Sequence, residues 1–183
     1  MAETKKISIE QFNEKPSKKE TKVIERKQPS KRRITTTAKW NFSDEDLSYD
    51  MQMSYIEQLK NDNIQNQSQC NMIISLLKQK LNSYLSQDKK KNRFSTDEFV
   101  KIDEVIRLLY ECNNICYYCK KPVEILYENV REPRQWSLER ISNDIGHNKG
   151  NLEIACLHCN VNRKTMNQER FVFTKQLNIV KTG

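Results

Sequence analysis

Hydrophobic residues recur at steps of three and four positions through the middle of the chain. Such steps place side chains on one face of a helix, and they predict helices over about 70–86 and 95–111. A Ser-x-x-Glu capping box begins the second of these, and an acidic capping sequence begins an earlier helix over about 43–60. We interpret the resulting stripes as packing faces. Their members are Ile73, Leu77, Leu81 and Tyr84, and Phe99, Ile102, Ile106 and Leu109.

The period changes after Cys119, where hydrophobic and polar residues alternate as they do along a strand. The alternation predicts strands over 123–127 and 135–141, and a third strand over 151–156 follows a loop rich in turn-forming residues. Helical spacing then returns, in a helix that begins at the second cysteine pair and in a last helix over 168–177. The pattern as a whole predicts an α+β fold.

Charge and composition divide the 183 residues into three regions. Residues 1–40 carry twelve Lys and Arg residues against five acidic ones, which is most of the net charge of +8. We predict that they form a disordered basic arm, because so few apolar groups cannot build a core. A helical region is expected over 41–111 and a small domain with strands over 112–183. Within the arm, Lys27–Arg33 is typical of a nuclear-import or nucleic-acid-binding patch, the alternative being a solvated arm with no specific partner.

Two features bear on where the protein works. No run of eighteen apolar residues is present, so we expect no membrane span. The first residues lack the apolar stretch of a secretory signal. We therefore expect an intracellular protein, and the basic patch suits a nuclear compartment, a virion or another nucleic-acid compartment of a host cell.

Cysteine spacing indicates a metal site. Four of the six cysteines form two C-x-x-C pairs, which are Cys116 with Cys119 and Cys156 with Cys159. In a reducing compartment this pattern is typical of a Cys₄ zinc site, and four thiolates leave no open position, so the zinc would be structural. Cys70 is interpreted as a packing residue. Cys112 is interpreted as a buried free thiol, with a role as an alternative ligand left open.

The order strand, loop, strand and helix, framed by the cysteine pairs, resembles the HNH endonuclease family over about residues 112–170. The most similar type is the zinc-containing form of phage recombination endonucleases. The resemblance implies a zinc-stapled ββα-metal domain that hydrolyses phosphodiester bonds of nucleic acid, with DNA expected, using Mg²⁺ or Mn²⁺. The residues that carry it are Leu138–Ile141, Gly146, Asn151–Leu152 and Ala155–Asn160, with Arg163 and Lys164.

Carried over by position, the resemblance implies that Glu139 and Asn160 hold the catalytic metal and that Asn151 braces the loop that orients the base. A carboxylate and an amide oxygen suit Mg²⁺, which prefers oxygen ligands and keeps several waters. The alternative for Glu139 is a strand carboxylate paired with Arg140 or Arg163, and for Asn151 a residue that caps a turn. The predicted nucleic-acid contacts are Arg140, Asn151, Arg163 and Lys164, with a solvated helix face as the alternative for the last two.

The departure from the family pattern lies at the general base. Arg140 stands where the family has histidine, and a guanidinium cannot accept a proton near neutral pH. It can clamp a phosphate or stabilise developing negative charge. His147, in the loop before Asn151, is the candidate replacement base; its alternative is a loop histidine that only hydrogen-bonds or touches phosphate. Otherwise metal-bound hydroxide acts with little help, or the domain has lost its chemistry.

Three functional hypotheses follow. The first is an HNH-type metal-dependent nuclease that uses Glu139, Asn160 and His147, with Arg140 at the phosphate. The second is a zinc-stapled module that binds nucleic acid without chemistry, as an accessory in transcription, packaging or repair. The third is an adaptor whose helices over 44–111 dock a protein partner or a second copy of the chain.

Overall fold

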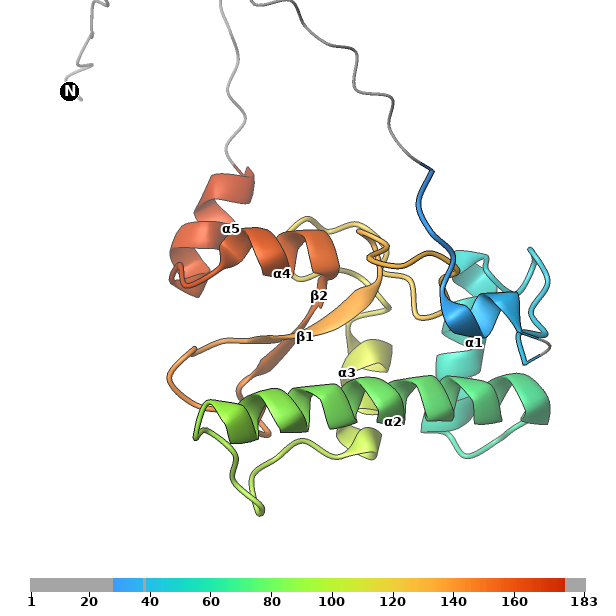
Figure 1. The fold of residues 1–183 in the computed structure, drawn as a ribbon, viewed down its shortest axis with the longest axis horizontal. Helices are drawn as coiled ribbons and strands as arrows, with labels where there is room; N and C mark the ends of the chain where they lie inside the picture. The colour runs from blue at the N-terminus through green and yellow to red at the C-terminus, as the bar shows by residue number, and fades with distance from the viewer. Residues whose placement is uncertain (1–27, 38, 177–183) are drawn as a thin grey trace, which may run out of the picture.

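The computed structural model describes residues 28–37 and 39–176. Most of the predicted basic arm, residues 1–27, lies outside the described residues. Within the described part, five α-helices, one 3₁₀ helix and a two-stranded antiparallel sheet give an α+β architecture (Figure 1). The elements are η1 (Arg33–Thr36), α1 (Tyr49–Lys60), α2 (Gln67–Lys90), α3 (Ile102–Glu111), β1 (Trp136–Arg140), β2 (Leu152–Cys156), α4 (Leu157–Arg163) and α5 (Gln168–Gln176).

The β1–β2 hairpin lies between the long helix α2 and the short helix α4 (Figure 1). On the α2 side, the Tyr84 hydroxyl accepts a hydrogen bond from the backbone N–H of Leu138 at 3.1 Å. The Lys80 ammonium lies 4.7 Å from the Trp136 ring centroid and donates to the Trp136 carbonyl. Because elements cover both faces, four of the five β1 residues are buried rather than alternate ones.

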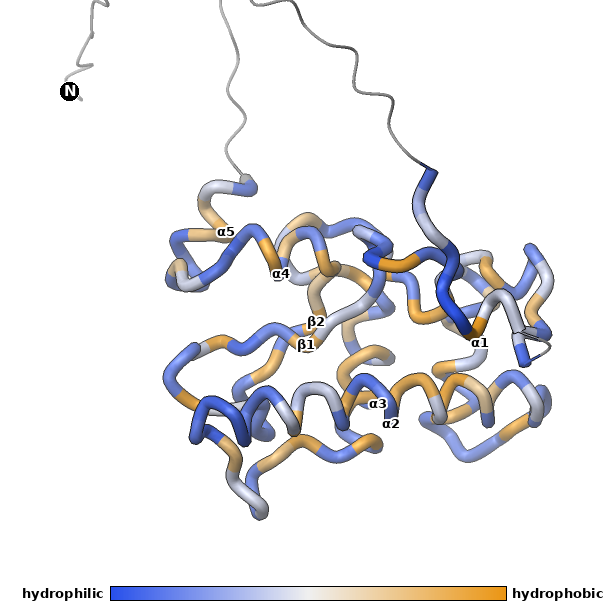
Figure 2. Tube along the Cα trace, in the orientation of Figure 1, coloured by the Kyte–Doolittle hydropathy of each residue, from blue (hydrophilic) through white to orange (hydrophobic). Residues whose placement is uncertain are grey.

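The predicted hydrophobic stripe of α2 is confirmed as a packing face. Its four members Ile73, Leu77, Leu81 and Tyr84 are all buried in one core that continues into the β1–β2 hairpin. Along α2, hydrophobic residues alternate with hydrophilic ones, and the C-terminal end of the helix is hydrophilic (Figure 2). This stripe of α2 is therefore occupied within the chain.

The third predicted helix begins later than expected. α3 starts at Ile102 and not at the capping box, because the segment before it pairs with the loop between β1 and β2. The N–H of Val100 donates to the His147 carbonyl at 3.0 Å, and the N–H of Lys149 donates to the Glu98 carbonyl at 2.8 Å. These tertiary hydrogen bonds use the backbone groups that a helix would have needed.

Residues 123–127 do not form the predicted strand. The N–H groups of Ile125 and Leu126 both donate to the side-chain oxygen of Gln52 in α1, at 2.8 and 2.9 Å. A buried side chain from another element thus satisfies donors that a sheet ladder would have used. The alternation of hydrophobic residues still reports burial, since Val123 and Ile125 lie in the core.

Two further boundaries shift. α1 begins at Tyr49, where Ser48 caps the helix by accepting from the Met51 N–H, so the acidic residues before it form a turn. The described part of the arm is ordered against residues 127–130, contrary to the predicted disorder of residues 28–37. The Arg32 guanidinium lies 4.1 Å from the Tyr127 ring centroid and donates to the Tyr127 carbonyl. The Ser30 carbonyl accepts a hydrogen bond from the Val130 N–H at 2.8 Å.

Candidate metal centre and adjoining polar pocket

The two cysteine pairs meet at one point, where the turn after α3 approaches the start of α4. The ligand atoms of Cys116, Cys119, Cys156 and Cys159 all lie within 4.8 Å of one another. Lys120, in the left-handed region with φ 56°, turns the first pair, and its N–H donates to the Cys116 carbonyl at 3.0 Å. In the second pair, the Cys159 N–H donates to the Cys156 sulfur at 3.4 Å.

These sulfurs fit a structural metal ion such as zinc. A Zn–S bond of about 2.3 Å in a tetrahedron places two sulfurs about 3.8 Å apart. The sulfurs of Cys119 and Cys156 are 3.9 Å apart. A hydrogen bond with the Cys156 thiol lowers the pKa of Cys116 to about 4, so one sulfur already favours the thiolate that binds metal.

The remaining two cysteines lie outside this cluster. Cys70 is fully buried in α2, as predicted for a packing residue. Cys112 is half-buried, and its sulfur contacts the Leu109 carbonyl at 3.4 Å, so it takes no part in the Cys₄ group.

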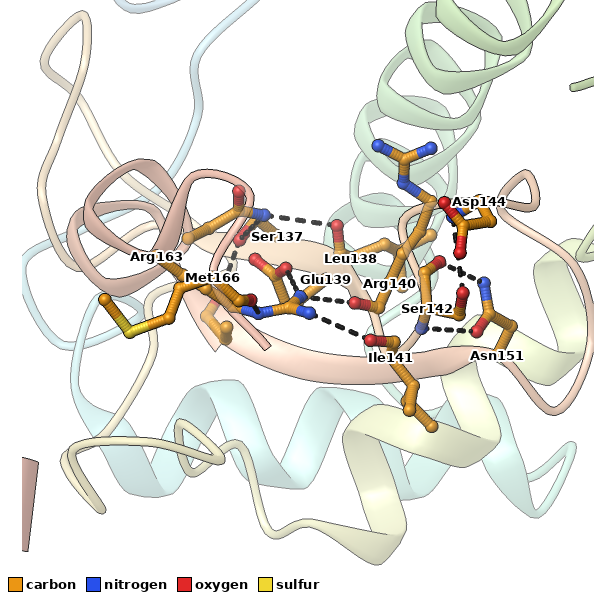
Figure 3. Close-up of polar contacts among 12 residues, drawn as sticks. Ser137, Leu138, Glu139, Arg140, Ile141, Ser142, Asp144, Asn151, Arg163 and Met166 are labelled. Carbon is orange, nitrogen blue, oxygen red and sulfur yellow. Dashed lines mark hydrogen bonds and ion pairs between the residues drawn. The ribbon is translucent and has the colours of Figure 1, made fainter. Parts of the chain in front are cut away.

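Glu139 is the fourth of the five residues of β1, opposite Glu153 in β2, and its side chain is turned toward α4. There it forms an ion pair with Arg163, with side-chain exposures of 5% and 1% (Figure 3). Of the alternatives considered for Glu139, the arginine partner is therefore Arg163 and not its neighbour Arg140.

Arg163 is a predicted nucleic-acid contact, but its side chain is buried. Its guanidinium donates to the carbonyls of Arg140, Ile141 and Met166 as well as to Glu139 (Figure 3). A side chain that is 1% exposed and fully engaged cannot face a phosphate. The predicted phosphate contact is therefore wrong, and so is the alternative of a solvated helix face, because this turn of α4 packs on β1.

One oxygen of Glu139 has no partner among the described residues. Oε1 accepts from Arg163, whereas Oε2 is buried and unpaired. Burial raises the pKa of Glu139, and the charge of Arg163 opposes that shift. An unpaired buried carboxylate oxygen is costly and commonly marks the place of an ion or a water. Glu139 therefore retains a donor atom that fits a divalent cation.

A polar pocket of about 260 Å³ lies beside this strand, between α2, β1 and α4. It brings together most of the predicted site residues and adds others from α2. Its lining residues are Tyr84, Gln87, Lys91, Leu138, Glu139, Arg140, Asn143, His147, Asn160, Val161 and Lys164. Arg140 leaves β1 toward α2, away from the Glu139–Arg163 pair (Figure 3).

Asn160 is held at the edge of this pocket by its amide group. Its Nδ2 donates to the Ser137 hydroxyl and to the Leu138 carbonyl, both at 3.2 Å. With the amide hydrogens directed at β1, the side-chain oxygen remains as an acceptor. Glu139 and Asn160 thus each line this pocket with a side-chain oxygen that accepts no hydrogen bond from the described residues.

His147 is buried at the opposite side of the pocket, in the loop between β1 and β2. Its Nδ1 lies 2.9 Å from one carboxylate oxygen of Asp88, and its backbone N–H donates to the other at 2.6 Å. Burial lowers the pKa of His147, and the hydrogen bond with Asp88 opposes that shift. Burial therefore favours the neutral form of the imidazole.

Asn151 closes the same loop. Its Nδ2 donates to the carbonyls of Ser142 and Gly146 at 3.0 and 3.1 Å, and its Oδ1 accepts from the Ser142 N–H at 2.9 Å. Buried within these bonds, Asn151 holds the loop in shape and does not present its side chain to a nucleic acid. The expected nucleic-acid contact at Asn151 is thus corrected to a structural one.

Three residues escaped the sequence analysis as site residues: Tyr84 and Asp88 in α2, and Lys91 directly after it. The predicted helix ends at residue 86, so the sequence carries no signal for Asp88. In the structure α2 continues to Lys90 and places Asp88 in its last turn, where the carboxylate faces the negative end of the helix dipole.

Comparison of the chain with protein-family models, with curated proteins and with solved structures finds no significant match. Among the described residues, no helix has the length and apolar character needed to cross a membrane.

Proposed function

We propose that this chain is an HNH-type nuclease that hydrolyses phosphodiester bonds of DNA with the help of Mg²⁺ or Mn²⁺. One observation carries the proposal: a single pocket collects a neutral imidazole, a carboxylate with an unpaired oxygen, an amide oxygen and three cations. The order of a two-stranded hairpin followed by a helix, beside a Cys₄ group, supports it as well.

The charges around the pocket suit a phosphate backbone. Lys91 follows the end of α2, Arg140 is the last residue of β1 and Lys164 follows the end of α4. All three line the pocket, and Lys91 and Lys164 are exposed. Such a convergence of cations raises the local concentration of a polyanion and positions its phosphates. Burial lowers the pKa of the Arg140 guanidinium, but an arginine is not deprotonated in proteins, so it supplies a permanent charge there.

The remaining groups divide the chemistry. His147 accepts a proton from the attacking water, because its imidazole is neutral and its Nε2 is not hydrogen-bonded by any described residue. Glu139 and Asn160 would hold the divalent cation. When bound, such an ion polarises a phosphoryl oxygen and stabilises the charge that develops on it.

The test is nicking of supercoiled plasmid by the purified full chain with Mg²⁺ or Mn²⁺. Glu139→Gln keeps a hydrogen-bond acceptor for Arg163 and removes the negative charge, so it tests metal binding with less damage to the fold than alanine. We expect Glu139→Gln and His147→Ala to lose on the order of a hundredfold or more in rate. Glu153→Gln, on the paired residue of β2, is the matched control and should nick like the wild type.

Plasmid that is bound but never nicked would reject the nuclease and favour a zinc-stapled binding module. Two observations favour such a binding module. Glu139 is already paired with Arg163, and position 140 holds an arginine where the family has its general base. A binding module predicts a salt-sensitive gel shift that Arg140→Ala and Lys164→Ala weaken and Glu139→Gln does not.

A further inference from the structure

The carboxylate of Asp88 contacts His147 at both its backbone and its ring. It receives the backbone N–H of His147 on one oxygen at 2.6 Å, and the ring Nδ1 lies within 3.0 Å of both oxygens. Asp88 lies in α2, 59 residues before the histidine. The Tyr84 ring, one turn earlier on the same helix, lies 4.5 Å from the imidazole, centroid to centroid. Helix α2 thus fixes both the position and the tilt of the imidazole.

The placement of Asp88 is costly unless something compensates it. Its side chain is only 1% exposed, and it lies in the last turn of α2, where the helix dipole disfavours negative charge. Departures of this kind from local preference are expected where a residue serves a site.

The loop is shaped to reach this carboxylate. A Cβ at Gly146 would lie 2.4 Å from the Arg93 carbonyl and 2.8 Å from an Asp88 oxygen, so only glycine allows the approach. The segment before α3 supports the loop from the other side, where Val100 donates to the His147 carbonyl. His147 is therefore held by α2 and by the segment before α3, both of which precede the first cysteine pair in the chain.

We infer that Asp88 is the positioning residue for the general base: it holds His147 with the proton on Nδ1 and leaves Nε2 free toward the pocket. The inference rests on the proposed function for its catalytic meaning. The tautomer itself is a property of the folded protein and can be measured without substrate. The pocket is then completed by the helical region, since neither β1, β2 nor α4 supplies an acceptor for Nδ1.

Substituting Asp88 by asparagine separates orientation from packing. In asparagine, one of the two oxygens of Asp88 is replaced by an NH₂ group. If the remaining oxygen accepts the backbone N–H of His147, the NH₂ group faces the ring Nδ1. The ring must then accept at Nδ1, and its proton moves to Nε2, where it blocks proton abstraction. An aspartate-to-asparagine change beside a catalytic histidine in serine proteases has this consequence, with a loss of about 10⁴ in rate.

The test is nitrogen NMR of the full chain labelled with ¹⁵N-histidine. The chain has two histidines, and the exposed His158 is the internal reference. We expect the wild-type His147 ring to show the Nδ1–H tautomer and the Asp88→Asn ring to show Nε2–H. The His147 pKa should also fall in the variant, because burial and the charges of Arg140 and Lys91 then act without Asp88 to oppose them. Asp144→Asn, an exposed carboxylate of the same loop, is the matched control and should change neither.

Plasmid nicking completes the experiment. Asp88→Asn should lose about a hundredfold or more in rate, while Asp144→Asn keeps the wild-type rate. An Nε2–H tautomer in the wild type overturns the inference without any variant, and so does a tautomer that Asp88→Asn leaves unchanged. If the tautomer depends on Asp88 but the wild type never nicks DNA, the positioning role stands and the proposed nuclease fails.

Discussion

Replacing Arg163 by alanine is expected to destabilise the fold strongly, although the residue lies on a short helix beside exposed lysine. The guanidinium is held by the Glu139 carboxylate and by the carbonyls of Arg140, Ile141 and Met166, the last two at 2.8 and 2.9 Å. Alanine removes all of these donors at once. It leaves a carboxylate in a place where its side chain is 5% exposed.

The magnitude follows from the uncompensated charge. Removing one partner of a buried ion pair costs about 3–5 kcal/mol. The three carbonyls that lose their donor add to this cost where water cannot reach them, so about 3 kcal/mol is the lower bound. That amount changes the unfolding equilibrium constant by about a hundredfold.

The assay is urea unfolding with zinc present, followed by the fluorescence of the buried Trp136. Lys164→Ala, one position further along and exposed, is the matched control and should change little. A double variant, Glu139→Leu with Arg163→Met, should recover part of the loss because no charge is left unpaired. If Arg163→Ala unfolds no more easily than Lys164→Ala, Arg163 is a solvated residue and the buried ion pair is refuted.

Two further predictions concern the metal centre and the base. The purified chain should carry one zinc. Cys159→Ser should lose that zinc and unfold at a lower temperature, because the four thiolates join the turn after α3 to the start of α4. Metal analysis and thermal unfolding check this, and the control variant Cys112→Ser, outside the cluster, should keep its zinc. The nicking rate should fall as the pH drops, because the base must be neutral. Since burial lowers the pKa of His147 below 6.5, the midpoint of that fall should lie below 6.5, with a plateau above it. A midpoint above 6.5 would show that Asp88 outweighs burial.

Local patterns predicted much of the secondary structure because they depend on near neighbours. The stripe of α2, the strands at 135–141 and 151–156 and the last helix match the observed elements to within a few residues. Where tertiary hydrogen bonds compete for the backbone, as at Gln52 with residues 125–126, the local pattern was no guide to the element formed.

The orientation of strand side chains shows the same limit. Alternation in β1 indicates that Trp136 and Leu138 share a face, but Ser137 and Glu139 are buried on the other face as well. The reason is that α4 folds back over that face. A pattern of period two reports which residues share a face, and it does not report whether a second element covers it.

The sequence by itself determined the Cys₄ group, because two C-x-x-C turns need only to meet once for four thiolates to surround an ion. The tertiary structure alone decided which charged residues face a pocket and which are buried. Arg163 finds Glu139 across 24 residues, and Asp88 finds His147 across 59. Such pairings depend on how α2, the hairpin and α4 stack, and no spacing along the chain encodes that distance.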